Sequence, residues 1–239
     1  MGNARLVSFI VPAHNEAQVI AATVASLHES ARGVGDSYEI LVVDDASTDD
    51  TADLARRAGA TVVPARLRHI AAARNVGGRA AKGNELLFVD ADTSVPGDTV
   101  RAALVAMRGG AAGGGARVRF DGPVPRYARP GVALTLGTFR LLNMTVGCFM
   151  FCTRDAYDRI GGFDERLFAA EEVAFSVAIK RIGRLALVEP AVVTSARKFR
   201  THTPFEVARM AAATVMGRAV LSRARLPLWY GDRRRDPGA

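Results

Sequence analysis

The chain of 239 residues contains only two cysteines, Cys148 and Cys152. If both lie on one extended strand, their Cα atoms are roughly 13 Å apart, which is too far for a disulfide. We therefore expect reduced core thiols in a cytosolic protein and no cysteine-based metal site. The sequence also lacks an apolar run as long as a membrane span. The short apolar run from Leu6 to Val11 leads into polar sequence, so no signal peptide is expected.

Acidic residues are scarce at the C-terminal end. Residues 197–239 contain ten Arg or Lys against three acids, whereas residues 1–196 contain 22 against 21. The net charge of +8 is therefore concentrated in the tail. Such a tail is a solvated chain end, a contact for an anionic membrane surface, or an aid in holding a phosphate-bearing ligand. It lacks the interleaved aromatic residues of a nucleic-acid-binding segment, so we expect no nucleic-acid partner.

Four residues near the tail strengthen the membrane interpretation, because Trp and Tyr suit the interface of a bilayer. They are Leu226, Leu228, Trp229 and Tyr230. The competing interpretation is that these side chains dock on the protein core. We expect a cytoplasmic protein that is peripheral at the inner face of the membrane if the tail binds lipid.

The hydrophobic content of the chain permits a sizeable core. In the first half of the chain, short apolar runs alternate with segments of helical periodicity. We expect strands at 7–11, 38–43, 60–63 and 86–90, and helices at 19–27, 47–58 and 70–81, the second of them capped by Ser47. This alternation predicts an α/β fold with a doubly wound, mostly parallel sheet and right-handed crossovers. Ligands of such sheets bind outside the carboxyl ends of the strands.

The second half is less regular. We expect helices at 100–107, 132–142, 171–182 and 204–221, strands at 116–120, 148–153 and 185–188, and a loop over the five glycines of 109–115. No internal repeat or linker is evident. We therefore expect one catalytic domain over 1–200, with a nucleotide-binding half (1–95) and an acceptor half (96–200), and then a basic helix and tail over 201–239.

Polar and acidic residues follow three of the expected strands. They are His14 and Glu16, Asp44 and Asp45, and Asp90 and Asp92. Two carboxylates separated by one small residue can bind a hard cation such as Mg²⁺ or Mn²⁺, which takes the rest of its ligands from water and substrate phosphates. An isolated Asp-x-Asp is also a common polar strand end, and Asp44 and Asp45 are also suited to helix capping.

Six short motifs occur in an order that resembles family 2 glycosyltransferases, the nucleotide-sugar enzymes of the GT-A fold. The motifs are Pro12-Ala13-His14-Asn15-Glu16, Asp44-Asp45-Ala46-Ser47-Thr48-Asp49, Ala73-Arg74-Asn75-Val76-Gly77, Asp90-Ala91-Asp92, Gly161-Gly162-Phe163-Asp164-Glu165 and Glu171-Glu172. Each is weak alone, but six in the family's order are jointly specific. They cover positions 12 to 172, and the C-terminal part matches less distinctly.

The resemblance implies a role for each motif. Nucleotide-binding residues would be Pro12, Ala13, His14, Glu16, Asp44, Asp45, Arg74 and Asp90. The divalent metal, Mg²⁺ or Mn²⁺, would be held on the donor diphosphate by Asp92, with Asp90 beside it. Outside the motifs, His202 is a weaker metal candidate or a surface residue, and Arg197, Lys198 and Arg200 are candidates for the pyrophosphate or the acceptor.

The pair Glu171-Glu172 departs from the Glu-Asp pair of the family. The resemblance implies that its second residue is the general base that deprotonates the acceptor hydroxyl, which favours Glu172, although Glu171 also qualifies and both acids suit a helix N-terminus. The implied reaction is metal-dependent, inverting transfer of a sugar from a nucleotide-diphosphate donor to a saccharide, lipid or other hydroxyl acceptor. Two alternatives are a nucleotidyltransferase and a non-catalytic, membrane-associated protein that binds nucleotide sugars.

Overall fold

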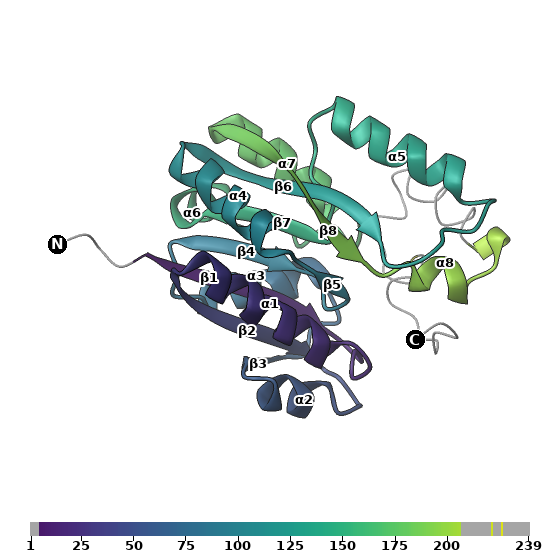
Figure 1. The fold of residues 1–239 in the computed structure, drawn as a ribbon, viewed down its shortest axis with the longest axis horizontal. Coiled ribbons are helices and arrows are strands. Elements are labelled where there is room, and N and C mark those ends of the chain that lie inside the picture. Colours follow the sequence, from purple (N-terminus) through teal and green to yellow (C-terminus); the bar gives the residue numbers. More distant parts are fainter. Residues whose placement is uncertain (1–4, 207–220, 222–225, 227–239) are drawn as a thin grey trace.

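A computed structural model describes residues 5–206 together with Leu221 and Leu226. Strands and helices alternate along this part of the chain (Figure 1). The strands are β1 (Leu6–Ala13), β2 (Ser37–Asp45), β3 (Thr61–Ala65), β4 (Glu85–Val89), β5 (Thr93–Ser94), β6 (Ala111–Phe120), β7 (Phe149–Thr153) and β8 (Arg184–Thr194). The helices are α1 (Ile20–Val34), α2 (Thr51–Arg57), α3 (Ile70–Ala80), α4 (Gly97–Arg108), α5 (Arg129–Leu141), α6 (Arg154–Ile160), α7 (Glu171–Ile182) and α8 (Arg197–Thr201).

The strands form one curled sheet in the order β3-β2-β1-β4-β7-β6-β8-β5. The first four of these pair in parallel, as the sequence predicts for a doubly wound half. Strand β7 then runs antiparallel to both β4 and β6, and β6 pairs in parallel with β8. Strand β4 is therefore the boundary between the parallel half and the mixed half, and the expected α/β fold with a mostly parallel sheet is confirmed.

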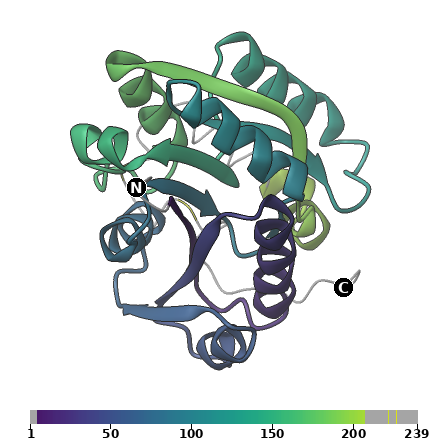
Figure 2. The same ribbon diagram turned by 60° about the vertical axis from the view of Figure 1, so that its left-hand side comes forward.

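Two cores lie on opposite faces of this sheet (Figure 2). Helices α1, α2 and α4 cover one face, and α3, α6 and α7 cover the other. Side chains of one strand alternate between the two cores, so that Phe9 of β1 lies in the first and Ile10 in the second. This alternation follows from the two-residue repeat of a strand that is buried on both sides.

The expected loop over 109–115 is wrong, because most of this segment belongs to β6. Gly113, Gly114 and Gly115 pair with both β7 and β8 in the middle of the sheet. A Cβ on Gly114 would come within 1.8 Å of the Ala186 carbonyl oxygen. The glycines therefore permit a close approach of strands, whereas composition alone suggested a flexible segment.

Substituting Gly114→Ala is expected to lower the free energy of unfolding by about 1–3 kcal/mol or more, because the added methyl group overpacks the sheet. Gly131→Ala in α5 is the matched control, since a Cβ there meets no atom within 4 Å. That control should be neutral or stabilising, because alanine favours helix. Urea unfolding of both variants measures the difference, and equal stability would show that β6 can shift to accommodate a side chain.

The strands expected at 60–63 and 185–188 extend further than predicted, and each includes a proline. Strand β8 continues through Pro190, where the pairing with β6 shifts register between Ala116↔Val188 and Val118↔Val192. A bulge leaves a residue outside the ladder, so the missing N–H of proline costs little there. Strand β3 includes Pro64 and is the outer strand of the sheet, where one side needs no partner.

The other differences from the prediction are one helix cap and one additional helix, whereas the cysteines agree with it. The cap of α2 is Asp50 instead of Ser47, whose hydroxyl accepts a hydrogen bond from the Asn15 N–H. Helix α6 was not expected from the sequence. Cys148 and Cys152 are free and buried, as predicted, and burial raises the pKa of both thiols.

The C-terminal predictions fall mostly outside the described residues. These comprise most of the expected helix over 204–221, together with Leu228, Trp229 and Tyr230. Leu226 is described and is buried, so it is not available to a lipid surface. Among the described residues, no helix has both the length and the apolar character that crossing a bilayer requires.

Candidate active site

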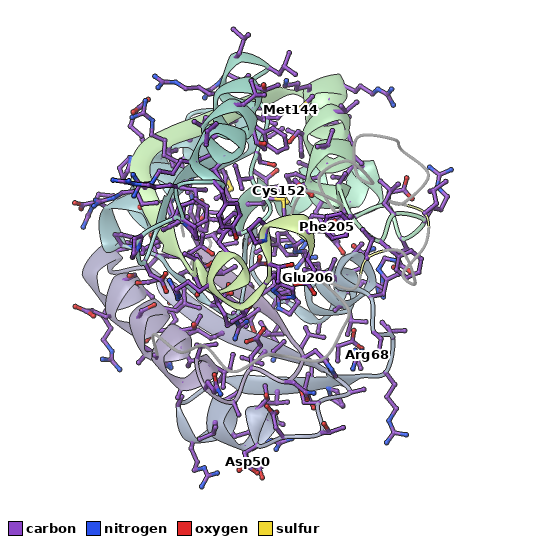
Figure 3. The ribbon with its side chains drawn as sticks, turned by 90° about the vertical axis from the view of Figure 1, so that its right-hand side faces the viewer. Asp50, Arg68, Met144, Cys152, Phe205 and Glu206 are labelled. Atoms are coloured by element: carbon purple, nitrogen blue, oxygen red, sulfur yellow. The ribbon has the colours of Figure 1, made fainter. Side chains whose placement is uncertain are left out.

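The predicted site residues gather where the parallel strands end. In Figure 3 the view is toward this side, with Arg68 on the rim of the parallel half and Phe205 and Glu206 over the middle. Pro12 and Ala13 end β1 and pair with Val43 and Asp44 of β2. The backbone of these two strands thereby sets the positions of the polar residues that follow them.

Asp45 is buried and holds the loop that leads into α3. Its Oδ1 accepts hydrogen bonds from the backbone N–H groups of Leu67 and Arg68, at 2.6 and 2.8 Å, and its Oδ2 accepts one from His69 at 2.8 Å. A carboxylate that accepts three backbone hydrogen bonds stabilises the local backbone conformation. The structure therefore shows that Asp45 positions this loop, and its role in nucleotide binding stays a prediction.

His14 is fixed in one tautomer by two neighbours. Its Nδ1 donates to the Asp45 carbonyl oxygen at 2.8 Å, which leaves Nε2 as the acceptor for the Arg68 guanidinium. Asp44 is half-buried at the same rim, and its Oδ1 accepts from the Ser47 N–H at 3.2 Å. Hydrogen-bond donors and acceptors of His14, Asp44 and Arg68 thus lie at the same rim, and such a combination suits a nucleoside.

Arg74 lies in the interior, with 1% of its surface exposed. Its Nη1 donates to Glu171 Oε1 at 2.6 Å, and its Nη2 donates to Asp90 Oδ1 and to the Gly147 carbonyl oxygen, each at 2.8 Å. Its guanidinium also lies 5.4 Å from the ring centre of Phe163. Burial alone would lower the pKa of Arg74, but the carboxylates of Asp90 and Glu171 outweigh it, so the pKa is raised.

These contacts change the interpretation of Arg74. The guanidinium is engaged by protein groups in this structure, and the expected position of Arg74 close to the nucleotide stays a prediction. Arg74 instead joins α3 to α7 and to the end of β4 through its two carboxylate partners. Because Arg74 donates a hydrogen bond to Asp90 Oδ1, at least this oxygen of Asp90 points toward the protein interior.

The two adjacent glutamates at the start of α7 are in different states. Glu171 is buried and paired with Arg74, whereas Glu172 forms no ion pair with any described residue. Burial, and then the charge of Glu171, raise the pKa of Glu172 to about 8. A Cβ built on Gly147 would lie 3.7 Å from the Glu172 carboxyl carbon and 3.8 Å from Arg74 Nη2, so a glycine flanks both groups.

Glu16 and Asp92 share a cation from the far end of the chain. Arg197 Nη2 donates to both Glu16 oxygens, at 3.0 and 2.9 Å, and lies 3.6 Å from Asp92 Oδ2. Glu16 is buried in this contact. Glu16 is therefore a partner of Arg197 in this structure, and Arg197 lies at the Asp-x-Asp motif. The nucleotide-binding role of Glu16 and the phosphate-binding role of Arg197 stay predictions.

The donor set fits a metal that is bound largely through its substrate. The described residues contain no group of three or more His, Cys, Asp and Glu side chains arranged to hold a metal. Asp92 provides a carboxylate at the strand end, beside Asp90, and a magnesium-like ion needs only one or two carboxylates when phosphate oxygens complete its shell. Asp92 would thus hold the ion, and Asp90 would contribute through its outer shell.

The remaining basic candidates lie beside this group. Arg200 pairs with Asp121 at 3.1 Å, and His202 Nδ1 hydrogen-bonds the Thr201 hydroxyl at 3.0 Å. Neither contact provides evidence of a metal-binding role for His202 or of phosphate contact by Arg200. The side chain of Lys198 lies outside the described residues.

Sequence reasoning missed several residues that hold the site together. Asn75 donates to the Phe163 carbonyl oxygen and to Glu165, and it accepts from the Phe163 N–H, so it fixes the Gly-Gly-Phe-Asp-Glu turn. Thr145 donates to the Glu172 carbonyl oxygen and hydrogen-bonds Ser176 at 2.9 Å. The signal for Asn75 was its position in a recognised motif, whereas Thr145 carried no sequence signal.

Non-glycine residues in the left-handed region of backbone conformation also collect at this rim. They are Asn15, Ala46, Arg68 and Ala170, with φ values of 52°, 60°, 49° and 63°. Left-handed backbone costs an L-residue roughly 1–2 kcal/mol, and such strain clusters at functional sites. Ala46 and Ala170 directly follow or precede the carboxylates of Asp45 and Glu171, so the strained backbone places those side chains.

Comparison with known proteins agrees with this geometry. The model of glycosyl transferase family 2 matches residues 8–161. No curated protein sequence matches the chain. Three solved structures illustrate the likeness in fold, and all are about one-fifth identical to this chain.

A mannosyltransferase from Pyrobaculum calidifontis in complex with GDP-Man and Mn²⁺ has a TM-score of 0.65 at 21% identity, covering 94% of this chain and 68% of that one. Glucosyl-3-phosphoglycerate synthase from Mycobacterium tuberculosis, in complex with Mn²⁺, UDP and glucosyl-3-phosphoglycerate, has a TM-score of 0.61 at 21% identity, covering 90% and 80%. TarS residues 1–349 from S. aureus has a TM-score of 0.58 at 21% identity, covering 93% and 69%.

The matched family model spans the segments that contain Glu16, Asp44, Arg74 and Asp92, and the neighbouring structures share the fold of this chain. The alternative of a nucleotidyltransferase is not supported by this match. The chain therefore belongs to glycosyl transferase family 2 and is a glycosyltransferase with the GT-A fold.

Proposed function

We propose that this enzyme transfers a sugar from a nucleotide-diphosphate donor to a hydroxyl acceptor, with inversion at the sugar carbon, and that Glu172 is the general base. The observation that carries the proposal is the difference between the two adjacent glutamates. Arg74 neutralises Glu171, whereas half-buried Glu172 has a pKa raised to about 8 and no ion-pair partner among the described residues. A base works best when its pKa lies near the working pH.

In the proposed reaction, the acceptor hydroxyl oxygen attacks the anomeric carbon while its proton passes to the Glu172 carboxylate. The bond between that carbon and the diphosphate oxygen breaks, and the nucleoside diphosphate leaves with the bonding electrons. With Glu172 as the single base and no carboxylate assigned as a nucleophile among the described residues, the proposed attack is opposite the leaving group, which inverts the configuration. Gly147, which lacks a side chain, leaves space beside Glu172 for the acceptor.

The donor would occupy the rim of the parallel half. Asp44 and His14, with Arg68 behind the imidazole, would contact the nucleoside, and Arg197 would lie near the diphosphate. A divalent metal held by Asp92 would neutralise the charge that develops on the leaving diphosphate. UDP- and GDP-sugars are the first donors to test, because structural neighbours of this chain bind UDP and GDP-Man.

Chelation of divalent metal by EDTA is expected to lower sugar transfer about 100-fold or more, and Mn²⁺ or Mg²⁺ should restore it, since a metal contributes several kcal/mol to stabilising the leaving group. Asp92→Asn should cause a similar loss that added metal does not repair. The matched control is Asp53→Asn, because Asp53 lies on the exposed surface of α2. Release of nucleoside diphosphate measures the rate, and full activity of Asp92→Asn would exclude Asp92 as the metal ligand.

A further inference from the structure

Helix α5 is unusual because none of its residues is buried, although its sequence is largely apolar. Leu134 is 73% exposed, Leu141 is 85% exposed, and the following Leu142 is 50% exposed. Figure 1 shows α5 at the edge of the molecule, away from the stacked strands of the parallel half. Isolated exposed leucines are ordinary, but several on one helix mark an interaction surface.

Two of the exposed leucines, Leu134 and Leu141, lie on one face of α5, and Leu142 follows the helix as its C-cap. Val132, Leu136 and Phe139 are partly buried and recur at helical spacing, so they form the face toward the protein. At about 100° per residue, Leu134 and Leu141 lie nearly opposite that face. This outward face also carries small residues, Gly137 and Thr138, so the two leucines project beyond their neighbours.

The charged side chains of α5 and of the segments beside it in the sequence are all basic. Arg126, Arg129 and Arg140 are exposed in and beside α5, and no Asp or Glu occurs between Asp121 and Asp155. Arg129 and Arg140 are eleven residues apart, so they lie on the same flank of the helix, to the side of the leucines. Long basic side chains that flank an apolar ridge are typical of helices that lie in the headgroup region of anionic membranes.

Both ends of α5 are attached to the body of the protein. Tyr127, before the helix, donates its hydroxyl to the Phe199 carbonyl oxygen at 3.2 Å. After the helix, Lys180 of α7 donates to the Leu142 carbonyl oxygen at 2.5 Å, and the Asn143 amide donates to Leu185. The outward face therefore has a fixed orientation, which lowers the entropy lost when it docks on a surface.

We propose that α5 docks this enzyme on an anionic lipid surface, with Leu134, Leu141 and Leu142 in the headgroup region and Arg126, Arg129 and Arg140 against lipid phosphates. A second copy of the chain is a poorer partner for this face. In a symmetric dimer the same patch meets itself, so the arginines of both copies would be brought together without any acid to neutralise them. The surface is distinct from the basic tail, and the proposal does not depend on the identity of the sugar donor.

Vesicle flotation of the full chain tests the proposal. We expect flotation with phosphatidylcholine vesicles that contain phosphatidylglycerol, and at least about tenfold less with phosphatidylcholine alone or at high salt, because anionic lipid attracts each basic residue. The double variant Leu134→Glu/Leu141→Glu should reduce flotation about tenfold or more, and Arg129→Gln/Arg140→Gln should reduce it by a smaller factor. Val105→Glu is the matched control, since Val105 is 64% exposed on helix α4 and should bind as the unmodified protein does.

Three results would overturn the proposal. One is unchanged flotation of the Leu134→Glu/Leu141→Glu variant. Another is loss of flotation only when the chain is shortened to end at Arg225, which would assign the contact to the tail. The third is a dimer in light scattering that the leucine variant dissociates, without vesicle binding by the original protein. Circular dichroism melts of all variants establish that each is folded, because the substituted side chains are exposed.

Discussion

Replacing Glu172 with Gln is expected to lower the rate of sugar transfer about 10²–10⁴-fold, because the amide cannot accept the proton of the acceptor hydroxyl. Binding of the nucleoside diphosphate should be nearly unchanged, since Glu172 lies on α7, away from the rim formed by His14 and Asp44. Transfer rates and thermal shifts with UDP or GDP measure the two properties separately. A variant that retains its transfer rate would reject Glu172 as the base, and unchanged biological activity would favour a binding protein over an enzyme.

The pH dependence follows from the raised pKa of Glu172. A base acts when it is ionised, so the transfer rate at low substrate concentration should rise about tenfold per pH unit up to pH about 8 and then level off. The Glu172→Gln variant should lack this rise. Glu171→Gln leaves the proposed base in place but removes a charge that raises its pKa, so the rise should remain and move to lower pH.

The Glu172 carboxyl group should also make folding stability depend on pH, but stability should fall as the pH rises, whereas the transfer rate rises. Its pKa is about 8 in the folded protein and near 4.5 in an unfolded chain, so the folded state favours the neutral carboxyl. The contribution of the Glu172 carboxyl group to folding stability is therefore fully present below about pH 4.5, and it is lost as the pH rises toward 8. Glu172→Gln should melt at a higher temperature than the original protein at pH 8.5 and at nearly the same temperature at pH 4.5. This result would show that burial of the carboxyl group has a cost in the folded protein.

Replacing Arg74 with Met is expected to lower the free energy of unfolding by about 3–5 kcal/mol, because it leaves the buried Glu171 carboxylate and the Asp90 carboxylate without their cation. Urea denaturation measures the loss. Arg56→Ala is the matched control: its ion pair with Asp53 is exposed, so its removal should cost no more than about 1 kcal/mol. The double change Arg74→Met/Glu171→Gln should recover part of the stability, since the amide does not leave a buried charge.

We expect Arg74 to affect catalysis in a way that a purely structural residue would not. Its positive charge lowers the pKa of Glu172, although less than burial and Glu171 raise it. The variants Arg74→Met and Arg74→Lys therefore separate two roles. Lys keeps the charge without the two-sided geometry of the guanidinium, so its pH profile should stay near that of the original protein, whereas in the Met variant the rise should move to higher pH. Profiles that coincide for all three proteins would limit Arg74 to a structural role.

The parallel half of the fold could be predicted because each of its strands carries a local signal. Apolar runs end in polar motifs at His14, Asp44 and Asp90, and each is followed by helical periodicity. The mixed half lacks such signals. Gly113, Gly114 and Gly115 have low strand propensity, and only the close approach of β7 and β8 explains their place in the middle of the sheet.

The site was predictable in its composition but not in its pairing. Glu16, Asp44, Asp45, Asp90 and Asp92 lie at or just after the ends of parallel strands, so their convergence follows from topology. Glu171 and Glu172 come instead from the start of α7. Which charge meets which depends on burial and on contacts between distant residues, such as Glu16 with Arg197, which are 181 positions apart. Arg74 illustrates the limit: its motif places it near the site, but only its burial shows that it supports the carboxylates from beneath.

Strand β5 contains only Thr93 and Ser94, yet it pairs with the last residues of β8 at Thr194 and Val193. Because β5 follows Asp92 directly, this pairing brings the two ends of the strand series β4-β7-β6-β8-β5 close together, like the ends of an incomplete ring. Asp92 and Arg197 lie on either side of that closure. Two residue pairs are a small number to keep a ring closed, so opening there costs less than elsewhere in the sheet. Asp92 and its partner Arg197 thus lie beside the β5–β8 pairing, which has the fewest residue pairs in this sheet.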